Sequence, residues 1–211
     1  MLGEVKNYYD VLGPRVAEAM KKRCFEAYYC STAAEAAEMV LSLIPAEDSV
    51  AWGGSVTLNQ LGIKDALRQR GQTMIDRDTV PPEEREETMR RAVLADTFLM
   101  SSNAVTEDGQ LFNIDGKGNR VAALCFGPKS VIVVAGMNKV VKDLDAAYSR
   151  VRSYAAPVNA KRLDCKTPCA ATGECADCVS PDCICANMVT TRYSRPNGKI
   201  KVVLVGEELG F

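Results

Sequence analysis

The spacing of apolar residues predicts strands that alternate with helices along the chain. A helical period marks residues 7–27, 81–94 and 140–151, and a further helix is predicted between an N-cap at Thr32 and a stop at Pro45. Short apolar runs predict strands at residues 25–30, 49–52, 73–75, 97–102, 111–114, 121–126, 131–135 and 201–205. The alternation indicates a largely parallel sheet with crossover helices on its faces.

We therefore predict an α/β fold in which a mostly parallel sheet is flanked by helices. The apolar run at 201–205 follows a cysteine-rich segment and is expected to return to the same sheet. The cysteine-rich segment, residues 163–188, is then an insertion near the C-terminus of a single domain that spans residues 1–211. A chain of this length can bury one hydrophobic core.

The composition excludes several classes of function. Hydrophobic residues make up 47% of the chain and the net charge is -1, so no attraction to nucleic acid is expected. The chain lacks an apolar stretch of about 18 residues and a signal-peptide core. These features predict a cytoplasmic protein with reduced thiols and no membrane partner. The chain has 0 histidines, which excludes Ser-His-Asp and Cys-His catalysis. Any proton transfer must therefore use Asp, Glu, Lys, Cys or Tyr.

The first candidate site is the sequence Gly53-Gly54-Ser55-Val56-Thr57, where a predicted strand leads into a helix. Ligands collect at the carboxyl ends of strands in open α/β sheets, and helix N-termini present free N–H groups to anions. Two glycines let the backbone approach a phosphate or carboxylate, and Ser55 and Thr57 add hydroxyls. A tight turn without a ligand is the alternative. The neighbouring Trp52 is expected either to form a wall of the cleft or to pack in the core.

The second candidate is the polar stretch 101–120, which follows a predicted strand. A hairpin-like turn within it returns Asp115, Asn119 and Arg120 towards that strand. The density of amide, carboxylate and guanidinium groups favours a ligand site, whereas Asp-Gly and Gly-Asn pairs are also ordinary turn residues.

The third candidate is a cluster of six cysteines between Cys165 and Cys185, with the spacing C-x3-C-x5-C-x2-C-x4-C-x-C. Thiolates in a close-spaced loop can converge on zinc or an iron-sulfur cluster, both of which favour sulfur ligands. A disulfide pair or reduced buried thiols are the alternatives. The remaining three, Cys24, Cys30 and Cys125, have apolar neighbours and are expected to be core residues.

Several stretches along nearly the whole chain resemble, in the same order, sequences of one protein family. They are Gly-Gly-Ser-Val-Thr at 53–57, Asn-Ala-Val-Thr-Glu-Asp-Gly at 103–109, Asp-Gly-Lys-Gly-Asn-Arg-Val-Ala-Ala at 115–123, Phe-Gly-Pro-Lys at 126–129, Gly-Met-Asn-Lys at 136–139, residues 152–163, and the ending 202–211. With these stretches the chain resembles the LUD-domain family (formerly DUF162), which includes the C component of bacterial lactate-utilisation operons.

The resemblance implies a fold similar to the sugar-phosphate isomerase and CoA-transferase superfamily, whose cleft at the strand ends binds phosphorylated sugars, CoA esters or folates. No residue matches the catalytic glutamate of a CoA transferase, because the available Glu107 lies in a predicted turn. Catalytic residues are therefore not assigned. By position, the ligand-binding residues would be Gly53, Gly54, Ser55, Thr57, Asn103, Thr106, Asp115, Asn119, Arg120, Asn138 and Lys139.

The resemblance also implies a metal-binding quartet formed by Cys169, Cys175, Cys178 and Cys185, with an iron-sulfur cluster or zinc as the cofactor. Cys165 and Cys183 are additional thiols in this comparison.

Three functions follow as expectations. The leading one is an accessory or ligand-binding component of L-lactate or organic-acid utilisation, which binds an anionic small molecule and acts with iron-sulfur partner proteins. The second is a stand-alone isomerase-like or transferase-like enzyme for a phosphorylated or CoA-linked metabolite, with a carboxylate of raised pKa in its cleft. The third is a thiol or metal redox sensor. The superfamily also suggests a homo-oligomer.

Overall fold

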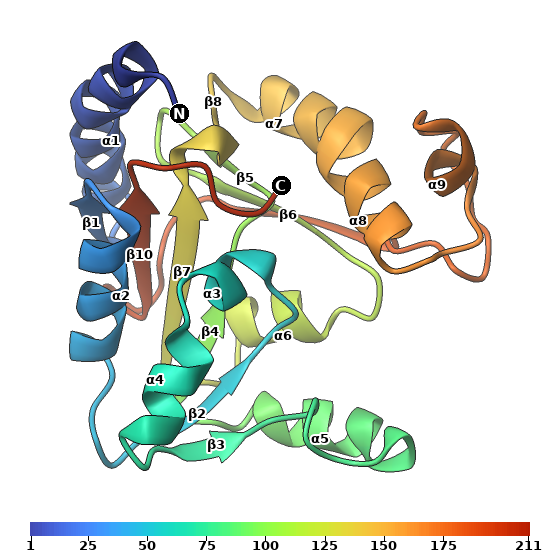
Figure 1. Cartoon of the computed structure of the whole chain (residues 1–211), viewed down its shortest axis with the longest axis horizontal. Helices are drawn as coiled ribbons and strands as arrows, with labels where there is room; N and C mark the ends of the chain where they lie inside the picture. The colour runs from blue at the N-terminus through green and yellow to red at the C-terminus, as the bar shows by residue number, and fades with distance from the viewer.

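Six parallel strands form the main sheet in the computed structural model, which describes residues 1–211 (Figure 1). Their order across the sheet does not follow the sequence, since the last strand of the chain lies between the first strand and a central one. From one edge to the other they are β1 (Glu26–Cys30), β10 (Ile200–Val205), β7 (Ser130–Gly136), β4 (Thr97–Met100), β2 (Ser49–Trp52) and β3 (Thr73–Ile75).

The central strands are apolar along their whole length because both faces of the sheet are covered. In β7, residues 131–136 are all buried, and their side chains alternate between the two faces. Such continuous apolar runs are typical of parallel strands between two layers of helices. They are also the reason why β7 and β10 are readily predicted from sequence.

Two sets of helices bury the two faces. One face packs against apolar residues of α1 (Gly3–Lys22), α5 (Arg85–Ala92) and α6 (Asn119–Cys125). The other face packs against α2 (Ala33–Ser42), α3 (Val56–Gln60) and α4 (Ile63–Gln69). The N-cap of α2 is Thr32, whose hydroxyl accepts a hydrogen bond from the backbone N–H of Glu35, as predicted.

A second, four-stranded sheet lies beyond the carboxyl ends of the first (Figure 1). Its strands, in order, are β8 (Val140–Val141), β5 (Ala104–Thr106), β6 (Leu111–Asp115) and β9 (Asn187–Thr191). The chain then adds α7 (Leu144–Arg150), a π-helical turn (Val151–Ala155), α8 (Ala156–Arg162) and, within the cysteine-rich segment, α9 (Pro168–Thr172). Short 3-10 turns occupy Pro82–Glu84 and Met137–Lys139.

The predicted fold class is confirmed, as a mostly parallel sheet flanked by helices. Two element predictions are wrong. Residues 121–126 were predicted as a strand, but residues 121–125 belong to α6 and Phe126 is its C-cap. The prediction failed because a short apolar run cannot be assigned to a strand or a helix by its period alone. The predicted helix at 140–151 starts only at Leu144, with Asp143 as its N-cap, while Val140 and Val141 pair with β5.

The second sheet was not predicted as a sheet. Its edge strand β9 has the sequence Asn-Met-Val-Thr-Thr and only exposed or half-buried residues, so it carries no long apolar run. None of the helices combines the length and the hydrophobicity needed to cross a bilayer.

Candidate functional site

A cavity of about 310 Å³ opens at the carboxyl ends of the parallel strands, between the two sheets and α8. We call it the strand-end cavity. Its walls come from the β2–α3 turn, the ends of β3, β4 and β7, the β6–α6 loop and the tail after β10. Its polar lining includes Ser55, Thr57, Ser101, Asp115, Lys139 and Arg162.

Most of the residues predicted from the sequence lie together in this cavity. They come from turns far apart in the chain, which the parallel topology brings to one edge of the sheet. The predicted residues that line the cavity are Gly54, Ser55, Thr57, Asn103, Asp115, Asn119, Arg120 and Lys139.

Three predicted residues lie outside the lining. Gly53 is buried behind the side chain of Arg120. The Thr106 hydroxyl hydrogen bonds to Asp108 and accepts a hydrogen bond from the Gln110 backbone in the β5–β6 turn. Asn138 positions the tail after β10, since its side chain accepts from the Leu209 N–H at 3.1 Å and donates to the Gly210 carbonyl at 3.3 Å.

Ser55 and its glycine neighbours shape the turn at the end of β2. The Ser55 hydroxyl caps α3 by accepting a hydrogen bond from the Leu58 N–H at 3.2 Å. A Cβ atom on Gly54 would lie 2.8 Å from a guanidinium nitrogen of Arg77. A larger residue at position 54 would therefore have to displace the end of the Arg77 side chain, which follows β3.

Arg120 is fully occupied by protein acceptors. Its two terminal nitrogens donate to the carbonyl oxygens of Ser101 and Ile114, each at 2.7 Å, and to the side-chain oxygens of Asn103 and Asn113, each at 2.9 Å. The remaining nitrogen, Nε, is 3.3 Å from a carboxylate oxygen of Asp115. Burial lowers the pKa of the guanidinium, and Asp115 opposes this shift. Arg120 thus joins the ends of β4 and β6 and holds the cavity wall in shape.

Lys139 is a second buried cation of the cavity. Its side chain follows β7, only 3% of the residue is exposed, and its Nζ lies 3.0 Å from both Thr57 Oγ1 and Ser101 Oγ. No acidic side chain is ion-paired with Lys139, and the one acidic side chain of the lining, Asp115, pairs with Arg120. Burial, and then the positive charges of Arg150 and Arg120, lower the pKa of Lys139 to about 7.

The charge of the lining is strongly one-sided. Arg77, Lys117 and Arg162 line the cavity together with Arg120 and Lys139, and Asp115 is the single acidic side chain among the lining residues. Cationic walls of this kind raise the local concentration of anions. Glu107 lies outside the cavity and pairs with Lys142 at 3.5 Å, in the turn predicted for it.

Several of the lining residues were not predicted from the sequence. Arg77 follows β3, and Gly210 and Phe211 follow β10, so attention to the carboxyl end of every strand would have found them. Asn159 and Arg162 come from α8, where no local pattern marks them. Trp52, considered as a cleft wall, instead packs in the core against α3 and α4.

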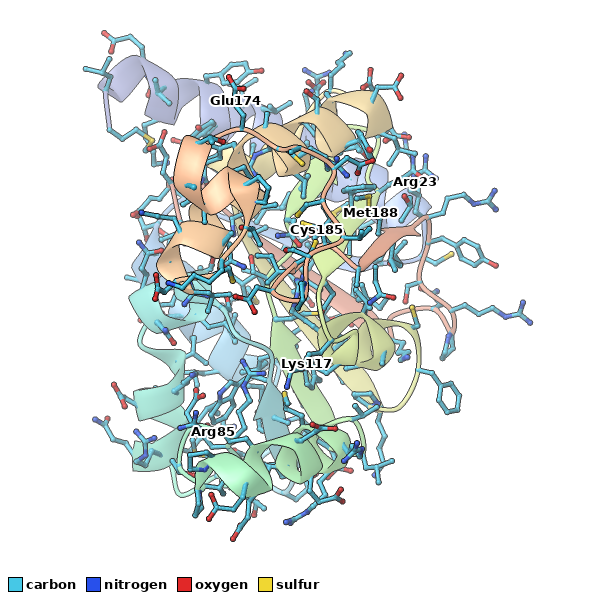
Figure 2. All side chains as sticks on the ribbon, turned by 90° about the vertical axis from the view of Figure 1, so that its right-hand side faces the viewer. Arg23, Arg85, Lys117, Glu174, Cys185 and Met188 are labelled. Atoms are coloured by element: carbon cyan, nitrogen blue, oxygen red, sulfur yellow. The ribbon has the colours of Figure 1, made fainter.

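Five cysteines line a second cavity of about 520 Å³, which we call the cysteine pocket. It lies between α8 and the segment that follows α9, on the face that Figure 2 shows, where Cys185 and Met188 are labelled. All nine cysteines of the chain are free thiols. The five that line the pocket are Cys169, Cys175, Cys178, Cys183 and Cys185.

The thiols of the cysteine pocket differ in acidity. Burial, followed by the charge of Cys183, raises the pKa of Cys185 to about 12, whereas hydrogen bonds from Ser180 lower the pKa of Cys178. No three of the cysteine and acidic side chains converge closely enough to hold a metal ion in this arrangement. The observed geometry is therefore not a preformed zinc or iron-sulfur site.

The three cysteines outside the cysteine-rich segment only partly match their predicted place in the core. Cys30 is buried at the end of β1, as expected. Cys24 is half-buried in the turn after α1, with a positive φ of 62°. Cys125 is exposed at the end of α6, because the segment predicted as a buried strand is a helix that turns this side chain outward.

The two cavities share a wall. Gly116 and Ile184 line both of them, and a Cβ atom on Gly116 would lie 3.1 Å from the Cα atom of Ile184. Ile184 stands between Cys183 and Cys185 in the sequence. The cysteine segment therefore borders the strand-end cavity directly.

The family model of the LUD domain matches residues 14–205. The chain belongs to the LUD-domain family. The chain is similar to a DUF162 family protein from Deinococcus radiodurans, with a TM-score of 0.55 and 12% identity over 93% of this chain and 97% of that chain. This likeness shows that the LUD-domain fold extends over nearly the whole chain.

A further solved structure, eIF2B delta from Chaetomium thermophilum, matches 50% of this chain and 47% of its own, with a TM-score of 0.33 and 17% identity. The comparison with curated proteins gives no match.

Proposed function

We propose that this LUD-domain protein binds a small organic anion, a carboxylate or a phosphorylated metabolite, in the strand-end cavity, as a ligand-binding component of L-lactate or organic-acid utilisation. The observation that carries the proposal is Lys139, a buried cationic side chain that has hydroxyl partners but no carboxylate partner. The family membership supplies the class of pathway.

An anion in the cavity would supply the missing counter-charge. A buried charge is costly unless it is paired, and burial accordingly holds the pKa of Lys139 near 7. A bound carboxylate or phosphate favours the protonated amine, so binding above pH 7 is accompanied by proton uptake. Arg77, Lys117 and Arg162 add positive charge around the same cavity.

Calorimetric titration tests this proposal. The wild-type protein is titrated with L-lactate, pyruvate and inorganic phosphate at pH 8, in two buffers of different ionisation enthalpy, so that proton uptake is measured directly. We expect Lys139→Met to weaken the binding of the preferred anion at least about tenfold, or roughly 1.4 kcal/mol. The matched control is Lys142→Met, which removes an exposed lysine outside the cavity.

Equal affinities of Lys139→Met and the wild type would contradict the proposal, as would the absence of heat with all three anions. A matching loss in Lys142→Met would show that the effect comes from the overall charge of the protein.

The cysteine pocket favours a second proposal, that its thiols bind zinc or an iron-sulfur cluster once the segment rearranges around the metal. Five free cysteines lining one cavity support it. Metal and acid-labile sulfide analysis, with a visible spectrum, is made on protein purified without oxygen. We expect Cys175→Ser and Cys178→Ser to lose the metal and Cys24→Ser to retain it. Equal metal content in all three would indicate adventitious binding.

We also propose that iron-sulfur proteins act with this chain and carry the electrons of the oxidation, as family membership suggests. Affinity purification under anaerobic conditions tests this, followed by iron and sulfide analysis of the co-purified proteins. Co-purified partners that carry no iron would contradict the proposal.

A further inference from the structure

The position of the Lys139 amine is fixed to an unusual degree. The residue lies in the 3-10 turn after β7, and the hydroxyls of Thr57 and Ser101 hold its Nζ from two sides. The tail passes close by, since a Cβ atom on Gly210, which has a φ of 60°, would lie 3.1 Å from this Nζ. The amine is thus held at the cavity wall and is not a freely moving surface group.

The surroundings of the amine favour its neutral form. Burial removes the water that would solvate an ammonium group, and the positive charges of Arg150 and Arg120 further disfavour the protonated form. With the pKa near 7, a large share of the amine carries a free lone pair at neutral pH. Removal from water and nearby positive charges are the two means by which proteins make a lysine nucleophilic.

Three further cationic side chains line the cavity. Arg77 enters from the end of β3 and Arg162 from α8, while Lys117 comes from the β6–α6 loop. None of these three is among the side chains that hydrogen bond to Lys139. A ligand that spans the cavity can therefore present a carboxylate to these cations and a second group to the amine. The volume of about 310 Å³ is at the lower end for ligand pockets and suits a small metabolite.

We propose that Lys139 is a nucleophile that forms an imine with the carbonyl group of a 2-oxo acid bound in the strand-end cavity. This inference rests on the proposed binding of organic anions and names 2-oxo acids as the substrate class.

The step balances without any oxidant or reductant. The lone pair of the neutral amine attacks the carbonyl carbon, the attacking nitrogen releases one proton, and the carbonyl oxygen takes up one proton, which gives a neutral carbinolamine. Loss of the nitrogen-bound proton and of the hydroxyl group as one water molecule leaves the carbon-nitrogen double bond. The hydroxyls of Ser101 and Thr57, each 3.0 Å from Nζ, are placed to relay these protons.

Reductive trapping tests the inference on the wild-type protein. Pyruvate is added as the probe, sodium borohydride reduces any imine to a stable secondary amine, and peptide mapping by mass spectrometry locates the added reduced pyruvyl group. We expect a single modified residue, Lys139, and trapping that increases as the pH is raised from 6 to 8. Lys142→Met should be trapped as well as the wild type, and Lys139→Arg should not be trapped.

Absence of the adduct, or labelling spread over surface lysines, would overturn the inference. Because the wild-type peptide map locates the label, the result does not depend on whether the Lys139→Arg variant folds. Titration with L-lactate, which has no carbonyl group, separates the two proposals. Binding of L-lactate without pyruvate trapping would leave anion binding standing and remove the imine, whereas failure of both would remove the proposed function as well.

Discussion

Gly53 has no side chain at the point where Arg120 crosses the end of β2, and a Cβ atom there would lie 2.8 Å from the Cγ and Cδ atoms of that arginine. The two residues are far apart in the sequence, yet each depends on the other. The glycine leaves room for the stem of the arginine, and the guanidinium group then reaches acceptors on β4 and β6.

The first prediction concerns this contact. Gly53→Ala places a methyl group against Arg120 and is expected to destabilise the fold by about 1–3 kcal/mol, the usual cost of overpacking. Urea unfolding followed by circular dichroism measures the change. The control is Gly3→Ala, because a Cβ atom at Gly3 meets nothing within 4 Å. Equal stability of both variants would show that the arginine stem moves aside freely.

The second prediction concerns the guanidinium group itself. Arg120→Met leaves Asp115 without its ion-pair partner, and Arg120 and Asp115 have only 13% and 8% of their side chains exposed. Breaking a buried pair on one side costs about 3–5 kcal/mol. Arg90→Met, which removes an exposed helix-surface pair with Glu86, should change stability little. A loss in Arg120→Met no larger than in Arg90→Met would contradict the bridging role assigned to Arg120.

The third prediction follows from the ionisation of Lys139. Below pH 7 the lysine is protonated in both the folded and the unfolded chain. Between pH 7 and pH 10.5, the ordinary pKa of a lysine, Lys139 is protonated only in the unfolded chain. The unfolded state thus binds more protons in this window, so the contribution of Lys139 to stability rises with pH.

Urea unfolding at pH 6.5 and pH 9.5 measures the free energy of unfolding of the wild type and of Lys139→Met. The difference between the two proteins isolates the contribution of Lys139, because the contributions of the other titrating groups cancel. We expect the wild type to gain stability relative to the variant by a few kcal/mol, since each pKa unit corresponds to about 1.4 kcal/mol. Lys142→Met should show no such trend. A difference that does not change with pH would place the pKa of Lys139 near its ordinary value.

The fourth prediction concerns the cysteine pocket. Hydrogen bonds from Ser180 lower the pKa of Cys178, and burial raises that of Cys185, so iodoacetamide at pH 7.5 should alkylate Cys178 faster than Cys185. Digestion at Asp182 separates the two residues for mass spectrometry. In urea their rates should become similar. Faster reaction of Cys185 in the folded protein would show that the pocket is arranged differently in solution.

The strands of the main sheet were predictable because each carries its own local signal. The strand Ser49–Trp52 was placed with its observed bounds, and so was Thr73–Ile75. The strand at 131–135 was placed within one residue at each end. These runs are apolar or β-branched and end at glycine, proline or polar residues, so no tertiary information is needed to find them.

The cavity was predictable only in outline. The rule that ligand sites lie at the carboxyl ends of parallel strands correctly brought Ser55, Thr57 and Lys139 together. The sequence does not show that Arg120 is ion-paired and Lys139 is not, because this depends on where the Asp115 side chain points. The sequence shows two cations and one carboxylate, and only the structure shows which cation is paired.

The place of β10 in the sheet has a consequence for how this chain is made. Its strand lies between β1 and β7, and β1 pairs with no other strand. During synthesis β1 therefore has no strand partner until residues 200–205 have been made. Contacts between such distant parts of a chain form slowly and expose strand edges in the meantime. We therefore expect nascent chains that lack β10 to require chaperones.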